Sequence, residues 1–159
     1  MLIEASKIGD AAKVKQLLDK GAPLEVPDKE YGRTALHLAS QHGHKEVVQL
    51  LLDKGAPLDV QDKKGWTALH LASVHGRKEV AQLLLDKGAP LDVQDRNGDT
   101  PLHLASSLGH KEVVQLLLDK GTSLDVQDKL GKTALHRASL RGHKEVVQQL
   151  LDKGAPLDV

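Results

Sequence analysis

A repeat of 33 residues is the feature that most constrains how this chain can fold. The tetrapeptide Thr-x-Leu-His recurs at that interval, and it begins at Thr34, Thr67, Thr100 and Thr133. A fixed period of this length is typical of stacked arrays, in which each unit contacts only its neighbours and the core is a continuous stripe. A chain of 159 residues would otherwise suggest one globular domain. The period instead predicts a single elongated domain.

The central unit, residues 62–94, indicates what each repeat is expected to form. Thr67 can cap a short helix that ends near Gly76. A second helix is predicted over Lys78–Lys87, because the acidic residue near its start and the lysine at its end both favour the helix dipole. The polar stretch that follows is too short for a third helix, and Asn97-Gly98 predicts a tight turn. Each unit should therefore contain a turn, two short helices and a long extended loop.

The terminal units carry polar residues where the internal units carry leucine. In the last unit these are Arg137 and Gln149, and in the first unit they are Glu4 and Gln16. Helices this short are marginal in isolation and must stack. A leucine exposed on an end of the stack would invite association between chains. We therefore predict a monomer, capped at both ends, with units at residues 1–27, 28–61, 62–94, 95–127 and 128–159.

Composition excludes several classes of function. The 22 basic residues cancel the 22 acidic ones, so no bulk field favours nucleic acid or an anionic membrane. Cysteine is absent, which excludes disulfides and a thiolate zinc site. The first residues lack the pattern of a signal peptide, and no apolar stretch approaches the ~20 residues of a membrane span. We expect a soluble, cytoplasmic protein with neither nucleic acid nor a membrane as partner.

The residues capable of chemistry follow the repeat rather than gathering at one place. Successive repeats should lie about 10 Å apart, too far for equivalent histidines to share a metal at ~2.0–2.1 Å. His42-Gly43-His44 is the only tight histidine pair, and no third ligand of fixed geometry lies nearby in the sequence. Serine recurs at one small helix position, which indicates packing because a nucleophile is needed once. We predict no enzyme, no catalytic residue, no metal site and no cofactor.

The repeated unit resembles the ankyrin repeat, whose pattern is roughly D-x-x-G-x-T-P-L-H-x-A-A-x-x-G-H-x-E-V-V-x-L-L-L-x-x-G-A. The resemblance covers essentially the whole chain. There are departures: the helix-opening proline is kept only at Pro101, and the second alanine is replaced by Ser40, Ser73, Ser106 and Ser139. The resemblance implies an all-α solenoid of helix–turn–helix pairs with β-turn fingers. It also implies that the histidine of Thr-x-Leu-His bonds the threonine and the loop backbone.

Positions that vary while the rest of the unit stays constant are the candidates for function. They fall at the turn tips and at the end of the first helix, which in the ankyrin family line the fingers and concave face where protein partners bind. Trp66 is the strongest candidate, because a lone tryptophan on an exposed turn has no core role and tryptophan is favoured in binding hot spots. The predicted partner-binding residues are Tyr31, Arg33, Gln41, His42, Lys64, Trp66, Val74, His75, Asp99, Ser107, Leu108, Leu130, Lys132, Leu140 and Arg141.

Two functional hypotheses remain open at this point. The first is a non-enzymatic module that binds a protein partner of unknown identity through its concave groove and finger tips, with Trp66 and Tyr31 as anchors. The second is a designed or consensus-derived scaffold, recombinant in origin and without a natural ligand. The second rests on the high identity between units, since Asp53–Asp62 is repeated without change as Asp86–Asp95.

Overall fold

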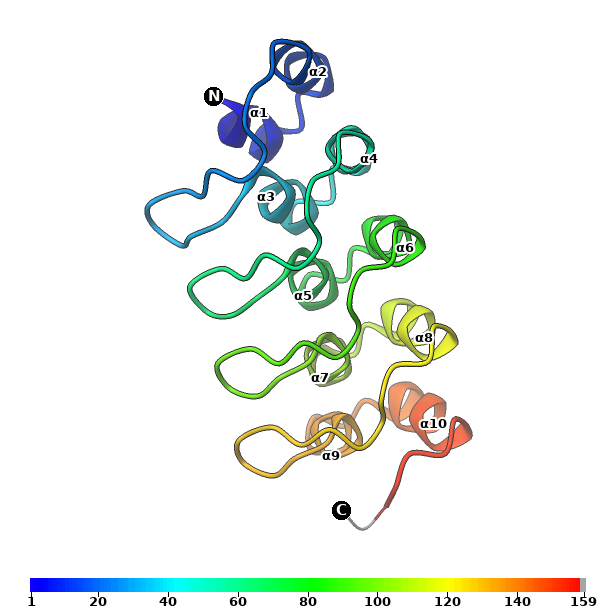
Figure 1. Cartoon of the computed structure of the whole chain (residues 1–159). Helices are drawn as coiled ribbons and strands as arrows, with labels where there is room; N and C mark the ends of the chain where they lie inside the picture. Colours follow the sequence, from blue (N-terminus) through cyan, green and yellow to red (C-terminus); the bar gives the residue numbers. More distant parts are fainter. Residues whose placement is uncertain (158–159) are drawn as a thin grey trace.

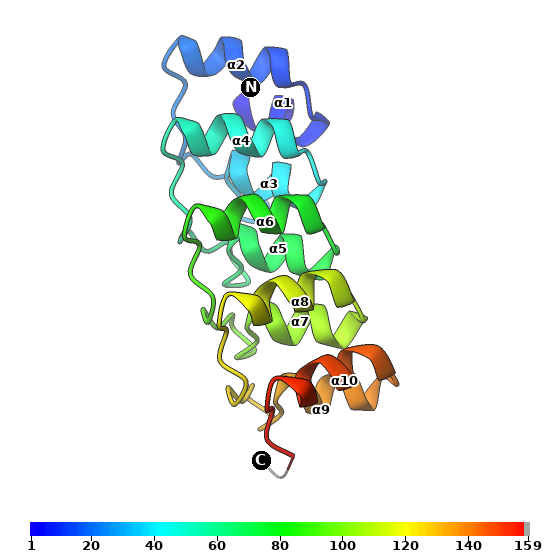
Figure 2. The ribbon, with the colours of Figure 1, turned by 90° about the vertical axis from the view of Figure 1, so that its right-hand side faces the viewer.

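The computed structural model describes residues 1–157, which form ten helices of seven to nine residues arranged in five antiparallel pairs. The pairs stack in chain order, so the two termini lie at opposite ends of the molecule (Figure 1). The first helices of the pairs form an inner row, and the second helices form an outer row beside it (Figure 2). The inner row comprises α1 (Leu2–Ile8), α3 (Ala35–Gln41), α5 (Ala68–Val74), α7 (Pro101–Leu108) and α9 (Ala134–Leu140). The outer row comprises α2 (Ala11–Asp19), α4 (Lys45–Asp53), α6 (Lys78–Asp86), α8 (Lys111–Asp119) and α10 (Lys144–Asp152).

No strand occurs within residues 1–157, and the predicted all-α solenoid is confirmed. The helix predicted over Lys78–Lys87 ends one residue earlier, with Lys87 as its C-cap. Each long loop projects away from the helices as a finger (Figure 1). In the last three fingers an i to i+3 bond closes a β-turn, as between Gly65 N and Asp62 O at 2.9 Å. Every predicted unit boundary falls in an extended segment between helix pairs.

Four of the inner helices, α3, α5, α7 and α9, begin with a reciprocal cap between threonine and histidine. In α5 the Thr67 hydroxyl accepts from His70 N at 3.3 Å, while His70 Nδ1 accepts from Thr67 N at 3.1 Å. Because Nδ1 accepts a backbone N–H, the proton of the neutral ring lies on Nε2, which donates to Asp99 O of the next finger at 3.0 Å. The predicted role of this histidine is confirmed. His37 and His103 repeat the arrangement on Trp66 O and Lys132 O.

A second line of bonds joins the outer helices to the preceding pair. The residue before each of α4, α6, α8 and α10 donates a side-chain N–H to a backbone carbonyl near the end of the previous inner helix. His44 donates to Lys7 O at 2.9 Å, so one member of the tight histidine pair has a structural partner. The equivalent donors are Arg77 to Gln41 O, His110 to Val74 O, and His143 to Ser107 O.

The core is an aliphatic stripe between the two rows. Leu51, Leu84 and Leu117 of successive outer helices are fully buried in it. Glu4 and Gln16 are exposed at the first end of the stack. Gln149, at the other end, folds back and donates to Lys111 O at 2.9 Å. None of the helices in the described part of the chain is long and apolar enough to cross a membrane.

Candidate functional site

Each finger is held by one aspartate, and in the last three fingers the two oxygens of this aspartate have different roles. Asp62 Oδ1 accepts from the backbone N–H of Lys64 at 2.8 Å and of Trp66 at 2.9 Å, which fixes its own turn. Its Oδ2 accepts from Arg33 Nε of the preceding finger at 3.0 Å. A backbone bond from Lys63 N to Tyr31 O at 2.9 Å runs alongside. One side chain therefore shapes a finger and ties it to its neighbour.

The same joint recurs one unit later with a different donor. Asp95 Oδ1 accepts from Asn97 N and Asp99 N, both at 2.8 Å. The donor to its Oδ2 is the indole N–H of Trp66, at 2.6 Å. Trp66 is half-buried, and Lys64 Nζ lies 5.0 Å from the centre of its ring. In these first two joints the residue before the capping threonine is thus the finger-to-finger donor.

The third joint has a donor from another element, because the side chain of Asp99 has no N–H group to donate to Asp128. Arg137 of α9 supplies it: Nη1 donates to Asp99 Oδ1 at 2.7 Å and to Asp128 Oδ2 at 3.0 Å. Arg137 was expected only to cap the stack, so sequence reasoning missed this role. The available signal was the acidic residue at a position where the other fingers carry donors.

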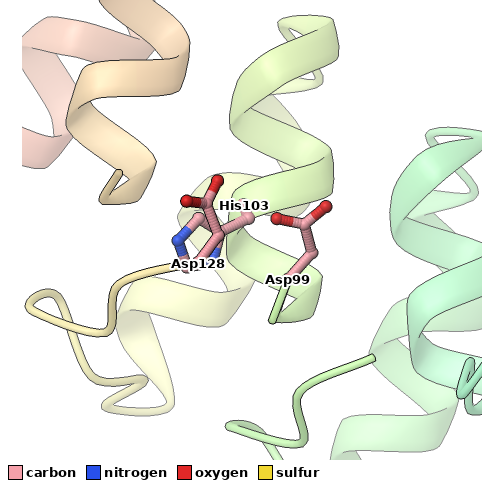
Figure 3. A group of neighbouring side chains, drawn as sticks. All are labelled: Asp99, His103 and Asp128. Carbon is pink, nitrogen blue, oxygen red and sulfur yellow. The ribbon is translucent and has the colours of Figure 1, made fainter. Parts of the chain in front are cut away.

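Asp99, His103 and Asp128 converge beside the first turn of α7, and one ligand atom from each lies within 4.8 Å of the others (Figure 3). Both nitrogens of His103 are already bonded, to Thr100 N and to Lys132 O. Burial raises the pKa of Asp99 despite the opposing charge of Arg137. Burial also acts to raise the pKa of Asp128, but backbone N–H groups of Lys132 and Leu130, with Arg137, outweigh it and the pKa is lowered. Asp99 and Asp128 therefore belong to a finger joint in which one guanidinium bridges two carboxylates.

A model of three ankyrin repeats matches residues 2–95 and again residues 87–159. The chain belongs to the ankyrin repeat family. Ankyrin repeats generally serve as protein–protein interaction modules, and the fold is typically non-enzymatic. None of the curated proteins matches the chain.

Four of the predicted binding residues of this ankyrin chain are not freely exposed. Trp66 was predicted to lie on an exposed turn without a core role; it lies outside the core but is half-buried, and its indole N–H donates to Asp95 in one of the finger joints. Arg33 and Asp99 are buried for the same reason, each bonded to a charged partner in a neighbouring element. Ser107 is buried in α7 beneath the fingers. The side chains of Arg33, Trp66 and Asp99 position the fingers, and any contact these residues or Ser107 make with a partner is limited to a small area.

The remaining candidates are exposed or half-exposed along the finger side of the ankyrin stack. Gln41 lies partly buried and accepts from Arg33 Nη1 at 2.9 Å, and Arg33 also lies 4.9 Å from the centre of the Tyr31 ring. Tyr31 itself is 44% exposed. Leu130 and Leu140 stand out, with 80% and 67% of their surface exposed. The others are His42, Lys64, Val74, His75, Leu108, Lys132 and Arg141.

A hollow of about 490 Å³ brings six of the candidates together at the C-terminal end of the ankyrin stack. It lies between the last two fingers and helices α7 and α9. The candidates that line it are Asp99, Ser107, Leu130, Lys132, Leu140 and Arg141. Tyr31, Arg33, Gln41, His42, Lys64, Trp66, Val74, His75 and Leu108 do not line it.

A second hollow of similar size, about 500 Å³, lies on the outer helices α4 and α6. Its lining repeats in the next pair, since Lys78, Glu79 and Gln82 have the same residue types as Lys111, Glu112 and Gln115. The outer hollow therefore offers no side chain type that is special to one place. The hollow between the last two fingers does, and it is the candidate functional site.

Proposed function

We propose that the chain binds a protein partner through the concave side of the stack, formed by the inner helices and the fingers. The observation that carries this proposal is the hollow between the last two fingers, where side chains that differ between units line one surface. Leu130 and Leu140 are exposed there with nothing to shield them within residues 1–157. Aliphatic side chains in that position would gain free energy if a partner removed them from water.

The joints between fingers support the same proposal. Arg33, Trp66 and Arg137 each fix one finger against the next through a carboxylate. A surface that is already fixed loses little conformational entropy when a partner docks. Tyr31, exposed on the first finger, is the proposed anchor at the other end of the groove, where a large rigid aromatic ring suits a binding hot spot.

The proposal is tested by selecting binders from a library of random short peptides displayed on phage. The dissociation constants of the selected peptides are then measured for the wild type and for the double variant L130A/L140A. We expect affinity to fall at least about tenfold, because each leucine buries apolar area on binding. The matched control is L157A, which truncates a leucine that is 75% exposed outside the hollow. Selected peptides that bind the double variant as tightly as the wild type would refute groove binding.

A second candidate function is a scaffold, designed or consensus-derived, that has no natural ligand. It is favoured by the unchanged repetition of Asp53–Asp62 as Asp86–Asp95 and by the same threonine–histidine helix caps in successive units. On this hypothesis the exposed groove residues are neutral surface. Peptide selection should then return either no binders or binders that are indifferent to the finger side of the stack.

A further inference from the structure

The chain has no net charge, but its exposed charge is unevenly distributed. The fingers comprise residues 28–33, 62–66, 95–99 and 128–132. Most of their acidic residues form hydrogen bonds within the fingers. Asp62, Asp95 and Asp128 are buried and accept from backbone N–H groups. Glu30 is the one fully exposed acid on these segments, whereas the exposed bases are Lys29, Lys63, Lys64, Arg96 and Lys129. The exposed charged groups on the fingers of this neutral protein are therefore mostly basic.

The excess is concentrated at the hollow between the last two fingers. Its lining holds four cations, Lys129, Lys132, Arg137 and Arg141, against the two carboxylates of Asp99 and Asp128. Both carboxylates are already paired with Arg137. Within residues 1–157 the other three cations make no ion pair. The lining therefore carries two positive charges in excess.

Hydrogen-bond donors are also left over in the hollow. Arg137 uses only Nη1 for its two carboxylate partners, and its other guanidinium nitrogens have no acceptor within the described residues. Because Arg137 Nη1 donates to both Asp99 and Asp128, the position of the guanidinium is fixed before any ligand binds. A guanidinium whose fork is only partly used suits a carboxylate, which can accept two parallel N–H bonds.

Apolar surface flanks these cations on two elements. Leu130 comes from the last finger and Leu140 from the end of α9, and both line the same hollow. Nucleic acid would neutralise the lysines but would leave two exposed leucines without a partner. A polypeptide carrying both a carboxylate and an aliphatic or aromatic side chain satisfies both parts of the lining.

We propose that this hollow recognises an acidic segment of a protein partner in which aspartate or glutamate lies next to a large apolar residue. The inference rests on the proposed function and names the chemistry of the partner. The carboxylate is bound by Lys132, Arg141 and the unused N–H groups of Arg137, and the apolar side chain lies between Leu130 and Leu140. Charge sets the specificity and the rate of encounter, so binding weakens as ionic strength rises.

The test selects random short peptides on the wild type and then measures their affinities for the wild type and for the charge-reversed variant K132E/R141E. The control K20E/K144E makes the same change in net charge at exposed lysines that have no ion pair within residues 1–157. We expect the peptides selected on the wild type to be enriched in aspartate or glutamate beside leucine, isoleucine or phenylalanine. One such peptide should lose at least about tenfold in affinity on K132E/R141E and less than about twofold on the control. Its affinity for the wild type should also fall with added salt.

Three outcomes overturn the inference, and they are distinguishable from failure of the proposed function. Peptides whose binding depends on Leu130 and Leu140 but that show no enrichment in acidic residues would leave groove binding intact. They would refute the proposal that the partner segment is acidic. Equal affinity for the wild type and K132E/R141E would do the same. A single-stranded oligonucleotide that binds the wild type more tightly than the selected peptide would reassign the cations to phosphate. Selected peptides indifferent to L130A/L140A would instead refute the proposed function itself.

Discussion

Four serines in the inner helices carry a buried hydroxyl that has no hydrogen-bond partner. They are Ser6, Ser40, Ser73 and Ser106, and each is fully buried where the ankyrin pattern has alanine. A buried polar group without a partner costs about 1–3 kcal/mol. We predict that S73A raises the free energy of unfolding by roughly 1 kcal/mol. Urea denaturation measures this, with S139A as control because Ser139 is exposed at the end of the stack. A loss of stability in S73A would mean that the hydroxyl bonds the preceding helical turn.

Trp66 was expected to be a surface anchor, and its indole N–H instead completes a finger joint. W66F keeps an aromatic ring but removes the donor to Asp95 Oδ2. We predict a loss of about 1–3 kcal/mol in stability, because a buried carboxylate oxygen loses its partner. Circular dichroism during chemical denaturation measures it without relying on tryptophan fluorescence. Y31F is the matched control, since the Tyr31 hydroxyl takes no part in any of the three finger joints. Equal stability of W66F and the wild type would contradict the joint.

Sequence reasoning reached residues whose partners lie within one repeat. Thr67 and His70 are three positions apart and recur in every full unit, so the resemblance to the ankyrin repeat was enough to predict their bond. The finger joints could not be predicted in this way, because Trp66 and Asp95 are 29 residues apart and the donor changes from unit to unit. Arg137 is 38 residues from Asp99 and replaces a leucine, so composition pointed to capping rather than to a bond.

At the scale of the finger, the third joint is the one that depends on another element. R137L restores the leucine of the internal units but leaves the carboxylates of Asp99 and Asp128 without their shared cation. We predict a loss of roughly 2–3 kcal/mol, less than for a fully buried pair because Arg137 is partly exposed. The same substitution should raise the pKa of Asp99 further, since burial already raises it and Arg137 opposes that effect.

A second substitution tests whether the loss comes from the joint. D99R places at position 99 the donor that the first finger has at Arg33, which bonds its aspartate at 3.0 Å. R137L/D99R should therefore recover most of the stability lost in R137L. Thermal unfolding of the single and double variants provides the comparison. Additive effects of the two substitutions would show that the joint does not account for the cost.

At the scale of the whole molecule, the histidine caps make stability depend on pH. Burial lowers the pKa of His37 and His70 below the ordinary 6.5. Protonation of Nδ1 would also break the bond from the threonine N–H. The unfolded chain binds more protons than the folded one in this range, so stability is complete above about pH 6.5 and falls as pH decreases towards the folded pKa.

We therefore predict that the denaturation midpoint falls between about pH 7 and pH 5, before most carboxylates titrate. Burial likewise lowers the pKa of the half-exposed His42 and of the more exposed His75, which adds to the same trend. Nuclear magnetic resonance titration of the His37 and His70 rings checks the assignment. Midpoints that rise on acidification, or ring pKa values at or above 6.5, would contradict it.

The two kinds of bond between units also determine which orders of units are permitted. The histidine and arginine side chains that join units donate to backbone carbonyls, so these bonds would form with any neighbour of the same shape. The finger joints end on side chains, and they distinguish one neighbour from another. A unit that carries Arg33 or Trp66 can precede any unit with the finger aspartate. The unit that carries Asp99 must be followed by one with Arg137. Recombination could therefore move the units that carry Arg33 or Trp66 to new positions. The unit that carries Asp99 and the unit that carries Arg137 can only be inherited together.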